Sequence, residues 1–382
     1  MSFSKQSIWL CLVLSSWFVF GDVKVLVLDT PVNRHHVYLK DVYDTEAMTR
    51  YSMPQIDGQF MSMLQINDEA YSNIVSALPK KTPHYLDLLD KTCKNDDPME
   101  AIGAALRLLF KLTNPFSKFN ENLLGNYTHG THVSGIIAQS VGQKGLHLLS
   151  FPLIGGRVSD GHHLDIEGVK KILASWISQQ EKVVKALIGF IYNENIRVVN
   201  LSISVPKSLS KKLREIANFR TRYSHKKELD ELLVSHLKQN AILIQSIALS
   251  CPETLFVFAA GNDSIDLDKN LDENLLASSK LPNTIFVANI SKQDELANSS
   301  NYGRHRVTIG APGESILNAR AGGGSIHFSG TSMAAPFVTG KLARIFLDHP
   351  TYTAAQALEE LYRRAEQRVC LADQISGGRV IY

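Results

Sequence analysis

The chain has 382 residues, of which 44% are hydrophobic and 20% charged, as in an ordinary globular protein with enough apolar material for a sizeable core. Its formal net charge of +3 excludes the strong charge imbalance that is typical of nucleic-acid or membrane-surface binders. Four cysteines are too few for a fold of this length to depend on disulfides, so the apolar core must stabilise it.

The N-terminal residues have the pattern of an export signal. Lys5 supplies a small positive charge, residues 8–20 form an almost uninterrupted apolar run, and Gly21 is a small residue near a cleavage point. We predict a signal peptide over 1–21, a secreted or periplasmic location and no stable membrane partner. The run is short for a permanent membrane span, and an uncleaved anchor is the alternative. Cleavage would leave three cysteines whose pairing stays open: Cys93, Cys251 and Cys370.

The mature region, 22–382, opens with an apolar run at 23–28 that predicts a strand buried on both faces. The next segment, 33–126, has scattered apolar residues and one clear helical pattern at 99–112. We interpret 33–126 as an insertion into a single domain.

Beyond this insertion, helical and strand patterns alternate. Apolar residues recur at helical spacing over 166–191 and 226–249, and short buried strands are predicted at 198–201, 255–258 and 284–288. This β–α–β rhythm predicts an α/β fold with three layers, in which a doubly wound, mostly parallel sheet is covered by helices on both faces.

Two segments offer an acid and an imidazole. Asp29 follows the first strand, and functional groups gather at the carboxyl ends of strands in an open parallel sheet. His129, followed by Gly130, is placed at a predicted helix start and is a candidate general base. Taken alone, Asp29 could equally be a turn or helix-capping residue. His129 and His132 could together bind a metal ion, but no glutamate between them and no third ligand supports that reading.

Two later segments offer an amide and a nucleophile. Asn262 ends a strand that runs through Gly261, and from there its amide N–H can point toward developing negative charge. Ser332 is predicted at a helix N-terminus after a tight entry at Gly330, where the helix dipole favours an anion. A simple Gly-Asn turn and a serine helix cap are the alternatives, although a cap does not explain the whole segment 329–336.

These segments resemble, in the same order, the signature blocks of the subtilases, a family of serine proteases. The order Asp, His, Ser is that of subtilisin, and Ser332 does not have glycine at both positions two residues away, as the nucleophile elbow of α/β-hydrolases does, because Ala334 follows it. The matching residues are Asp29-Thr30, His129-Gly130-Thr131-His132-Val133, Val199-Asn200-Leu201-Ser202, Ala259-Ala260-Gly261-Asn262, Ala311-Pro312-Gly313 and Gly330-Thr331-Ser332-Met333-Ala334-Ala335-Pro336.

The resemblance implies a subtilisin-like fold and a serine endopeptidase, acting as a monomer on polypeptide substrates. It implies that Asp29 stabilises the His129 imidazolium and that His129 takes the proton of Ser332, which forms an acyl-enzyme. Asn262 would complete the oxyanion hole. The implied substrate-binding residues are Ser202, Ala259, Ala260 and Gly261 around the pocket, and Gly155 on a strand that pairs with extended substrate.

Three features depart from the family pattern. Pro31 replaces the usual glycine, residues 203–206 replace a glycine pair, and the insertion separates Asp29 from His129. We expect no cofactor. The calcium loop of many subtilases is missing after the histidine helix, and the acidic alternation at 266–272 lacks the glycine and glutamate of a hand-type calcium loop. Calcium binding stays an open alternative.

Two other functions remain open. A subtilase fold with altered residues near Asp29 and the pocket could be a pseudoenzyme that only binds polypeptides. The same triad could also serve an esterase or another acyl transferase. Retention of all four candidate catalytic side chains favours an active enzyme, and the sequence does not define the pocket that would separate peptidase from esterase.

Overall fold

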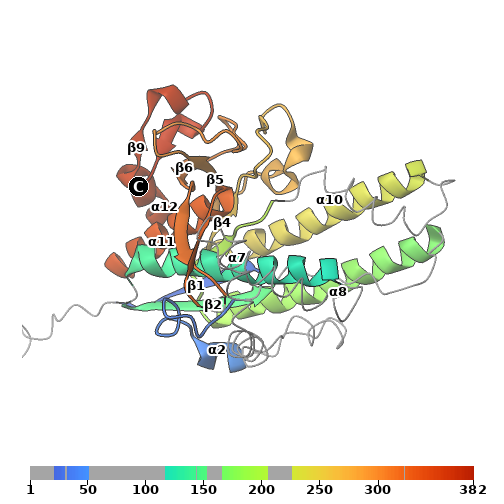
Figure 1. Cartoon of the computed structure of the whole chain (residues 1–382), viewed down its shortest axis with the longest axis horizontal. Coiled ribbons are helices and arrows are strands. Elements are labelled where there is room, and N and C mark those ends of the chain that lie inside the picture. The colour runs from blue at the N-terminus through green and yellow to red at the C-terminus, as the bar shows by residue number, and fades with distance from the viewer. Residues whose placement is uncertain are drawn as a thin grey trace, which may run out of the picture.

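The computed structural model of the chain describes residues 21–30, 32–50, 117–142, 144–152, 166–204, 226–321 and 323–382 (Figure 1). Residues 1–20 of the predicted signal peptide lie outside the described residues, as do Cys93 and most of the predicted insertion, including its helix at 99–112. The described part of the predicted insertion includes the short helix α2 (Thr45–Arg50).

A mostly parallel sheet of eight strands forms the centre, in the order β2-β1-β3-β4-β5-β6-β10-β9. The antiparallel pair is β9 with β10, at one edge. The strands are β1 (Val23–Asp29), β2 (Leu146–Pro152), β3 (Val198–Leu201), β4 (Leu255–Ala259), β5 (Thr284–Ile290), β6 (Ile309–Pro312), β9 (Glu366–Gln367) and β10 (Arg379–Val380). A separate antiparallel hairpin joins β7 (Ile316–Ala319) to β8 (Ser325–Phe328).

Alternate residues of the central strands point to opposite faces of the sheet. In β1, Val25 and Val27 are buried in one core, whereas Leu26 and Leu28 are buried in the other. A strand covered on both faces has no polar alternation, which is why its sequence is a continuous apolar run. The predicted strands at 23–28, 198–201, 255–258 and 284–288 are confirmed as β1, β3, β4 and β5.

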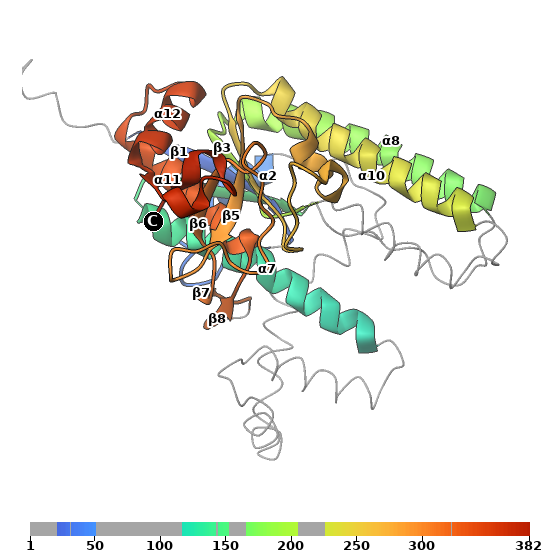
Figure 2. The ribbon, with the colours of Figure 1, turned by 90° about the horizontal axis from the view of Figure 1, so that it is seen from above.

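Helices cover both faces and complete the three layers. Helices α7 (Ser117–Val141) and α11 (Thr331–Asp348) contribute to the core that contains Val25. Helices α8 (Ile166–Asn193) and α10 (Lys226–Ser250) contribute to the core that contains Leu26. The predicted three-layer α/β fold is therefore confirmed, as are the helices predicted at 166–191 and 226–249. Figure 2 shows α8 and α10 lying side by side and extending past the sheet.

Helix α7 differs from the prediction because it begins at Ser117. His129 therefore lies inside a helix and not at its start, and the last part of the predicted insertion is the first part of α7. Near the other end of the chain lies helix α12 (Ala354–Arg364), whose N-terminus is capped by a capping box of Thr353 and Gln356. The described residues also form the short 3₁₀ helices η2 (Leu271–Glu273), η3 (Leu275–Ser278), η4 (Val369–Leu371) and η5 (Ser376–Gly378).

Helices α7 and α11 approach each other closely at Gly340. A Cβ added to Gly340 would lie 2.4 Å from the Cβ of Ser140 on α7, a separation that no relaxed side chain tolerates. The glycine is needed here for proximity, since it lies within a regular helix. This contact fixes the distance between the two helices.

We expect Gly340→Ala to lower the free energy of unfolding by about 1–3 kcal/mol, the usual cost of overpacking. The double variant Ser140→Gly/Gly340→Ala should recover most of that loss, because it removes the Cβ that is struck. Chemical denaturation of Gly340→Ala, Ser140→Gly and the double variant measures both effects. Losses that simply add in the double variant would show that the two residues do not compete for the same space.

Candidate catalytic site

The candidate residues come together at the carboxyl edge of three neighbouring strands. Asp29 is the last residue of β1, Ser202 follows β3, and Asn262 lies shortly after β4. These strands are adjacent in the order β1-β3-β4. Helices α7 and α11, on one face of the sheet, add His129 and Ser332.

A short hydrogen bond joins Asp29 to His129. The Asp29 carboxylate is fully buried, and its Oδ1 lies 2.6 Å from His129 Nδ1. The same Oδ1 accepts a hydrogen bond of 2.7 Å from the Thr30 N–H. Asp29 Oδ2 is buried without a hydrogen-bond partner in the described part of the chain. The His129 ring therefore lies against a buried negative charge, while 29% of its side chain remains exposed.

Gly130 allows α7 to come this close to the end of β1. Its N–H donates to Thr30 Oγ1 over 2.8 Å, so the residues that follow Asp29 and His129 are also joined. A Cβ added to Gly130 would lie 2.2 Å from the main-chain oxygen of Thr30. Any side chain at this position would push the histidine away from the aspartate.

The environment of His129 favours its protonated form. Burial of the ring lowers the pKa of His129, but the negative charge of Asp29 and the hydrogen bond that the ring donates to it raise the pKa by more. The pKa therefore lies above the ordinary value of 6.5. A neutral His129 can accept a proton, and the charged form that results is stabilised.

Ser332 is the second residue of α11, directly after the residues that open the helix. Its hydroxyl donates to the main-chain carbonyl of Ser202 over 3.0 Å, and the Ser202 hydroxyl donates to the main-chain carbonyl of Ser332 over 2.9 Å. The described residues contain no hydrogen bond between Ser332 and His129. The Ser332 hydroxyl must therefore turn away from Ser202 before it can give its proton to the imidazole.

Asn262 is oriented by Thr331, the first residue of α11. Its Oδ1 accepts from the Thr331 N–H at 2.9 Å and from the Thr331 hydroxyl at 3.0 Å. Because a backbone N–H can only donate, the side-chain atom facing Thr331 must be the oxygen. The Asn262 NH₂ group then points away from this contact. Asn262 is exposed, so this NH₂ group can donate a hydrogen bond to a ligand beside the N-terminus of α11.

Gly261 makes the turn that brings Asn262 to this position. Its φ of 107° is unfavourable for other residues, and a Cβ there would lie 2.4 Å from Asn301 Nδ2. The Gly261 N–H donates to Thr331 Oγ1 over 3.1 Å. Thr331 thus joins the end of β4 to the start of α11, a role that the sequence pattern did not assign to it.

The predicted substrate-binding residues have different environments. The Ala259 and Ala260 side chains are buried in opposite cores, so a substrate contact from them would involve only their main chain. Gly261 and Ser202 are buried beside Ser332 and its helix. Gly155 lies outside the described residues, as does Pro31.

His132 is separate from the candidate site. It is fully buried, and its Nε2 lies 3.0 Å from the carbonyl of Ile316 and 3.1 Å from that of Ile326, on the β7–β8 hairpin. Burial lowers the pKa of His132 to about 4, so the ring is neutral at physiological pH. His132 thus joins α7 to the hairpin.

The acidic residues at 266–272 bind protein groups. Asp266 forms an ion pair of 2.8 Å with Lys269, and both oxygens of Asp268 accept from the His305 N–H. Among the described residues no group of three or more His, Cys, Asp or Glu side chains is placed to hold a metal ion. No calcium site can therefore be assigned to this acidic segment.

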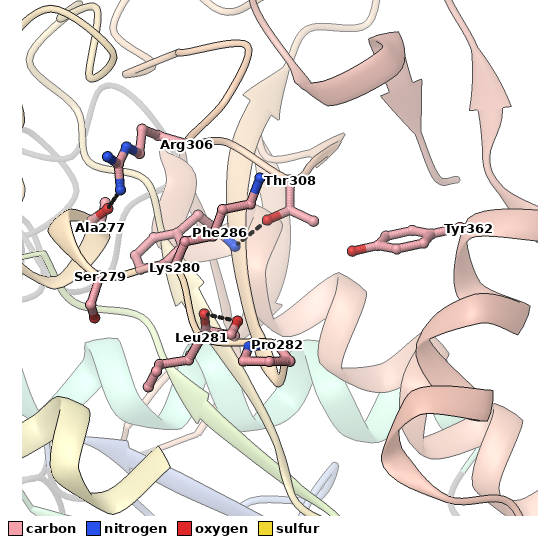
Figure 3. Close-up of a pocket in the computed structure, with 10 residues that line it drawn as sticks. Ala277, Ser279, Lys280, Leu281, Pro282, Phe286, Arg306, Thr308 and Tyr362 are labelled. Carbon is pink, nitrogen blue, oxygen red and sulfur yellow. Dashed lines mark hydrogen bonds between the residues drawn. The ribbon is translucent and has the colours of Figure 1, made fainter. Parts of the chain in front are cut away.

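A cavity of about 250 Å³ lies away from these residues (Figure 3). It opens near the amino end of β5, whereas the candidate catalytic residues lie at the carboxyl ends of β1, β3 and β4. None of the predicted site residues lines it. The lining residues are Ala277, Ser279, Lys280, Leu281, Pro282, Thr284, Phe286, Arg306, Thr308 and Tyr362.

The raised pKa of His129 can be measured by NMR titration of the histidine rings. We expect a pKa above 6.5 in the unmodified protein. In Asp29→Asn both raising contributions weaken while burial remains, so the pKa should fall below that of the unmodified protein. His132 is the internal control, because its pKa should stay near 4 in both proteins. An unchanged His129 pKa in Asp29→Asn would contradict the pairing of these two groups.

Comparisons with known proteins agree with the fold. The sequence pattern of the Subtilase family (peptidase S8) matches residues 21–376. Subtilisin-like protease 7 of Arthroderma gypseum is 44% identical over 85 residues, which are 22% of this chain and 20% of that protein. Subtilisin amylosacchariticus of Bacillus subtilis subsp. amylosacchariticus is 26% identical over 252 residues, which are 65% of this chain and 51% of that protein. The matches thus span from a fifth to half of these relatives.

Solved structures share the architecture. A lanthipeptide protease superposes with a TM-score of 0.53 and 17% identity, covering 94% of this chain and 86% of the other. The A-subunit of the AB5 toxin from E. coli superposes with a TM-score of 0.51 and 19% identity, covering 95% and 91%. At such identities the likeness concerns the fold alone. Because the family pattern covers nearly the whole chain, the protein belongs to the subtilase family of serine peptidases.

Proposed function

We propose that this protein is a serine endopeptidase that uses Asp29, His129 and Ser332 as its catalytic triad. The observation that carries the proposal is the buried Asp29 carboxylate, 2.6 Å from a partly exposed His129, at the sheet edge where α11 presents Ser332. Family membership supports the same chemistry. Geometry and family agree, although the relatives named above are matched over only part of their length.

In this mechanism Ser332 exchanges one hydrogen bond for another. Its hydroxyl leaves the Ser202 carbonyl and turns to His129 Nε2, which takes the proton as the oxygen attacks the substrate carbonyl carbon. The new C–O bond converts the carbonyl oxygen into an oxyanion. When this intermediate collapses, the amine leaves with the proton from His129, and water later hydrolyses the acyl-enzyme in the same way. Asp29 stabilises the imidazolium throughout.

Two donors support an oxyanion hole at this edge of the sheet. The Asn262 NH₂ group is directed away from Thr331, and the Ser332 N–H belongs to the first turn of α11, where helix N–H groups have no partner within the helix. The positive end of the helix dipole adds to their effect. In such a site preorganised donors stabilise the transition state more than the bound substrate.

The remaining features of the proposal concern substrate and location. We propose polypeptide substrates, a monomeric enzyme without a cofactor, and export to a secreted or periplasmic location. Ser202 and Gly261 lie beside Ser332 and support a pocket at this edge of the sheet. None of the helices in the described ranges is both long and apolar enough to cross a membrane.

A fluorophosphonate probe tests the nucleophile. The unmodified protein should react, with the modification mapped by mass spectrometry to Ser332, and it should hydrolyse casein. Ser332→Ala should lose both properties and keep its circular dichroism spectrum. The active-site geometry predicts no labelling of Ser202, because its hydroxyl is buried and bonded to Ser332. Labelling that persists in Ser332→Ala, or an unmodified protein that neither labels nor cleaves, would refute the proposal.

Substitution of Asn262 tests the oxyanion hole. We expect Asn262→Ala to lower kcat by roughly 10²–10³ with little change in KM, the loss known from removing one such donor in subtilisin, a member of the same family. Steady-state kinetics on a peptide substrate separates the two constants. A rise in KM with unchanged kcat would mean that Asn262 binds the substrate in its ground state.

A further inference from the structure

A buried chain of hydrogen bonds runs behind Ser332. Asn200, on β3, is fully buried, and its Nδ2 donates to Ser202 Oγ over 3.0 Å. Ser202 Oγ donates in turn to the main-chain carbonyl of Ser332 over 2.9 Å. On its other side, Asn200 Oδ1 accepts from the hydroxyl of Thr339 over 2.9 Å. Thr339 is also fully buried, two turns beyond Ser332 on α11.

The Asn200 amide lies with its Oδ1 2.9 Å from the Thr339 hydroxyl and its NH₂ group 3.0 Å from Ser202 Oγ. The single proton of the Thr339 hydroxyl has two acceptors within reach, Asn200 Oδ1 and, at 3.1 Å, the main-chain carbonyl of Ala335. An NH₂ group cannot accept a hydrogen bond, and the proton of the Ser202 hydroxyl must therefore point elsewhere. It points to the Ser332 carbonyl. The orientation of one buried amide thus sets the orientation of the hydroxyl beside the nucleophile.

The same chain attaches α11 to the sheet at two points. The first point is the start of the helix, which Asn200 reaches through Ser202. The second point is Thr339, to which Asn200 is hydrogen-bonded directly. Both points lie on the helix face that packs against β3. A buried network in which every member has a partner resists displacement, because breaking one bond leaves another group unsatisfied. This limits both sliding and rotation of α11 relative to β3.

We propose that Asn200 and Thr339 are positioning residues that hold Ser332 in register with His129, acting through Ser202. This inference rests on the proposed function of Ser332. Neither residue is placed to touch a substrate, since both are fully buried. Their effect is to keep the Ser332 oxygen within one rotation of the imidazole. Without them the start of α11 can shift, and Ser202 can turn its hydroxyl toward other acceptors.

The variant Thr339→Val tests this role, because it keeps the shape of the side chain and removes its donor. We expect the rate constant of fluorophosphonate inactivation and kcat to fall between about 10- and 100-fold, the scale expected when a reacting group is slightly misplaced. KM should change little. Thr339→Ser restores the hydroxyl and should recover most of the rate. Asn200→Asp, which replaces the donor to Ser202 by an acceptor, should lower the rate at least as far.

Thr254→Val is the matched control. Thr254 is buried like Thr339, and its hydroxyl donates to the main-chain carbonyl of Ile196 over 2.8 Å, at the amino edge of the sheet. This variant should lose a similar amount of stability and keep the unmodified inactivation rate. Equal rate losses in Thr254→Val and Thr339→Val, or a Thr339→Val enzyme that reacts at the unmodified rate, would overturn the positioning role.

Hydrogen exchange of the peptide that covers 329–336 separates this proposal from the proposed function. Faster exchange in Thr339→Val, with no change in Thr254→Val, supports the attachment of α11 whether or not the protein hydrolyses peptides. If the unmodified protein proves inactive and this exchange still differs, the function is wrong and the attachment stands. If the unmodified enzyme is active but neither its rate nor this exchange responds to Thr339→Val, the positioning role is wrong.

Discussion

The packing of α7 and α11 on one face of the sheet is the constraint on which the site depends. One helix carries His129 and the other Ser332, while Asp29 is fixed at the end of β1. At Gly340 the two helices approach so closely that a single Cβ would collide with Ser140. At Gly130 the first helix meets the chain after Asp29 with equally little space. Backbone proximity, rather than any one side chain, therefore sets the relative positions of Asp29, His129 and Ser332.

Few charged groups surround the candidate catalytic residues that the structure describes. A single buried carboxylate, Asp29, directs one oxygen to His129, and the other groups around Ser332 are neutral: hydroxyls, amides and main-chain carbonyls. A neutral polar network can be buried at modest cost when each group has a partner. Among the described residues, Asp29 is the charge that raises the pKa of His129. This arrangement is suited to stabilising the imidazolium that His129 becomes when it accepts a proton.

The sequence predicted the sheet well because its central strands are covered on both faces and read as unbroken apolar runs, as β1 and β4 do. It also predicted α8 and α10, whose apolar residues recur at helical spacing. It placed the start of α7 too late, because residues 117–128 are mostly polar and contain Gly125, which weakens the helical signal of that part of the chain. The convergence of Asp29, Asn262 and Ser332 followed from their positions after strands and at a helix start.

The hydrogen-bond partners could not be predicted in this way. Two hydrogen bonds depend on the register of α11 against β3: the one between Ser332 and Ser202, and the one between Thr339 and Asn200. This register cannot be inferred from the sequences of the two segments taken separately. Only weak signals exist: Asn200 and Ser202 share a strand face, and Ser332 and Thr339 share a helix face. Each signal gains meaning only when the two elements are known to be in contact.

The central claim is that Asp29, His129 and Ser332 act as one unit, and a double-mutant cycle on peptide hydrolysis tests it most directly. Initial rates are compared for the unmodified enzyme, His129→Ala, Ser332→Ala and the variant with both changes. If the residues act as a unit, each single variant loses nearly all activity and the double variant is little worse than either. Losses that multiply in the double variant would show that His129 and Ser332 contribute independently, and would contradict the account.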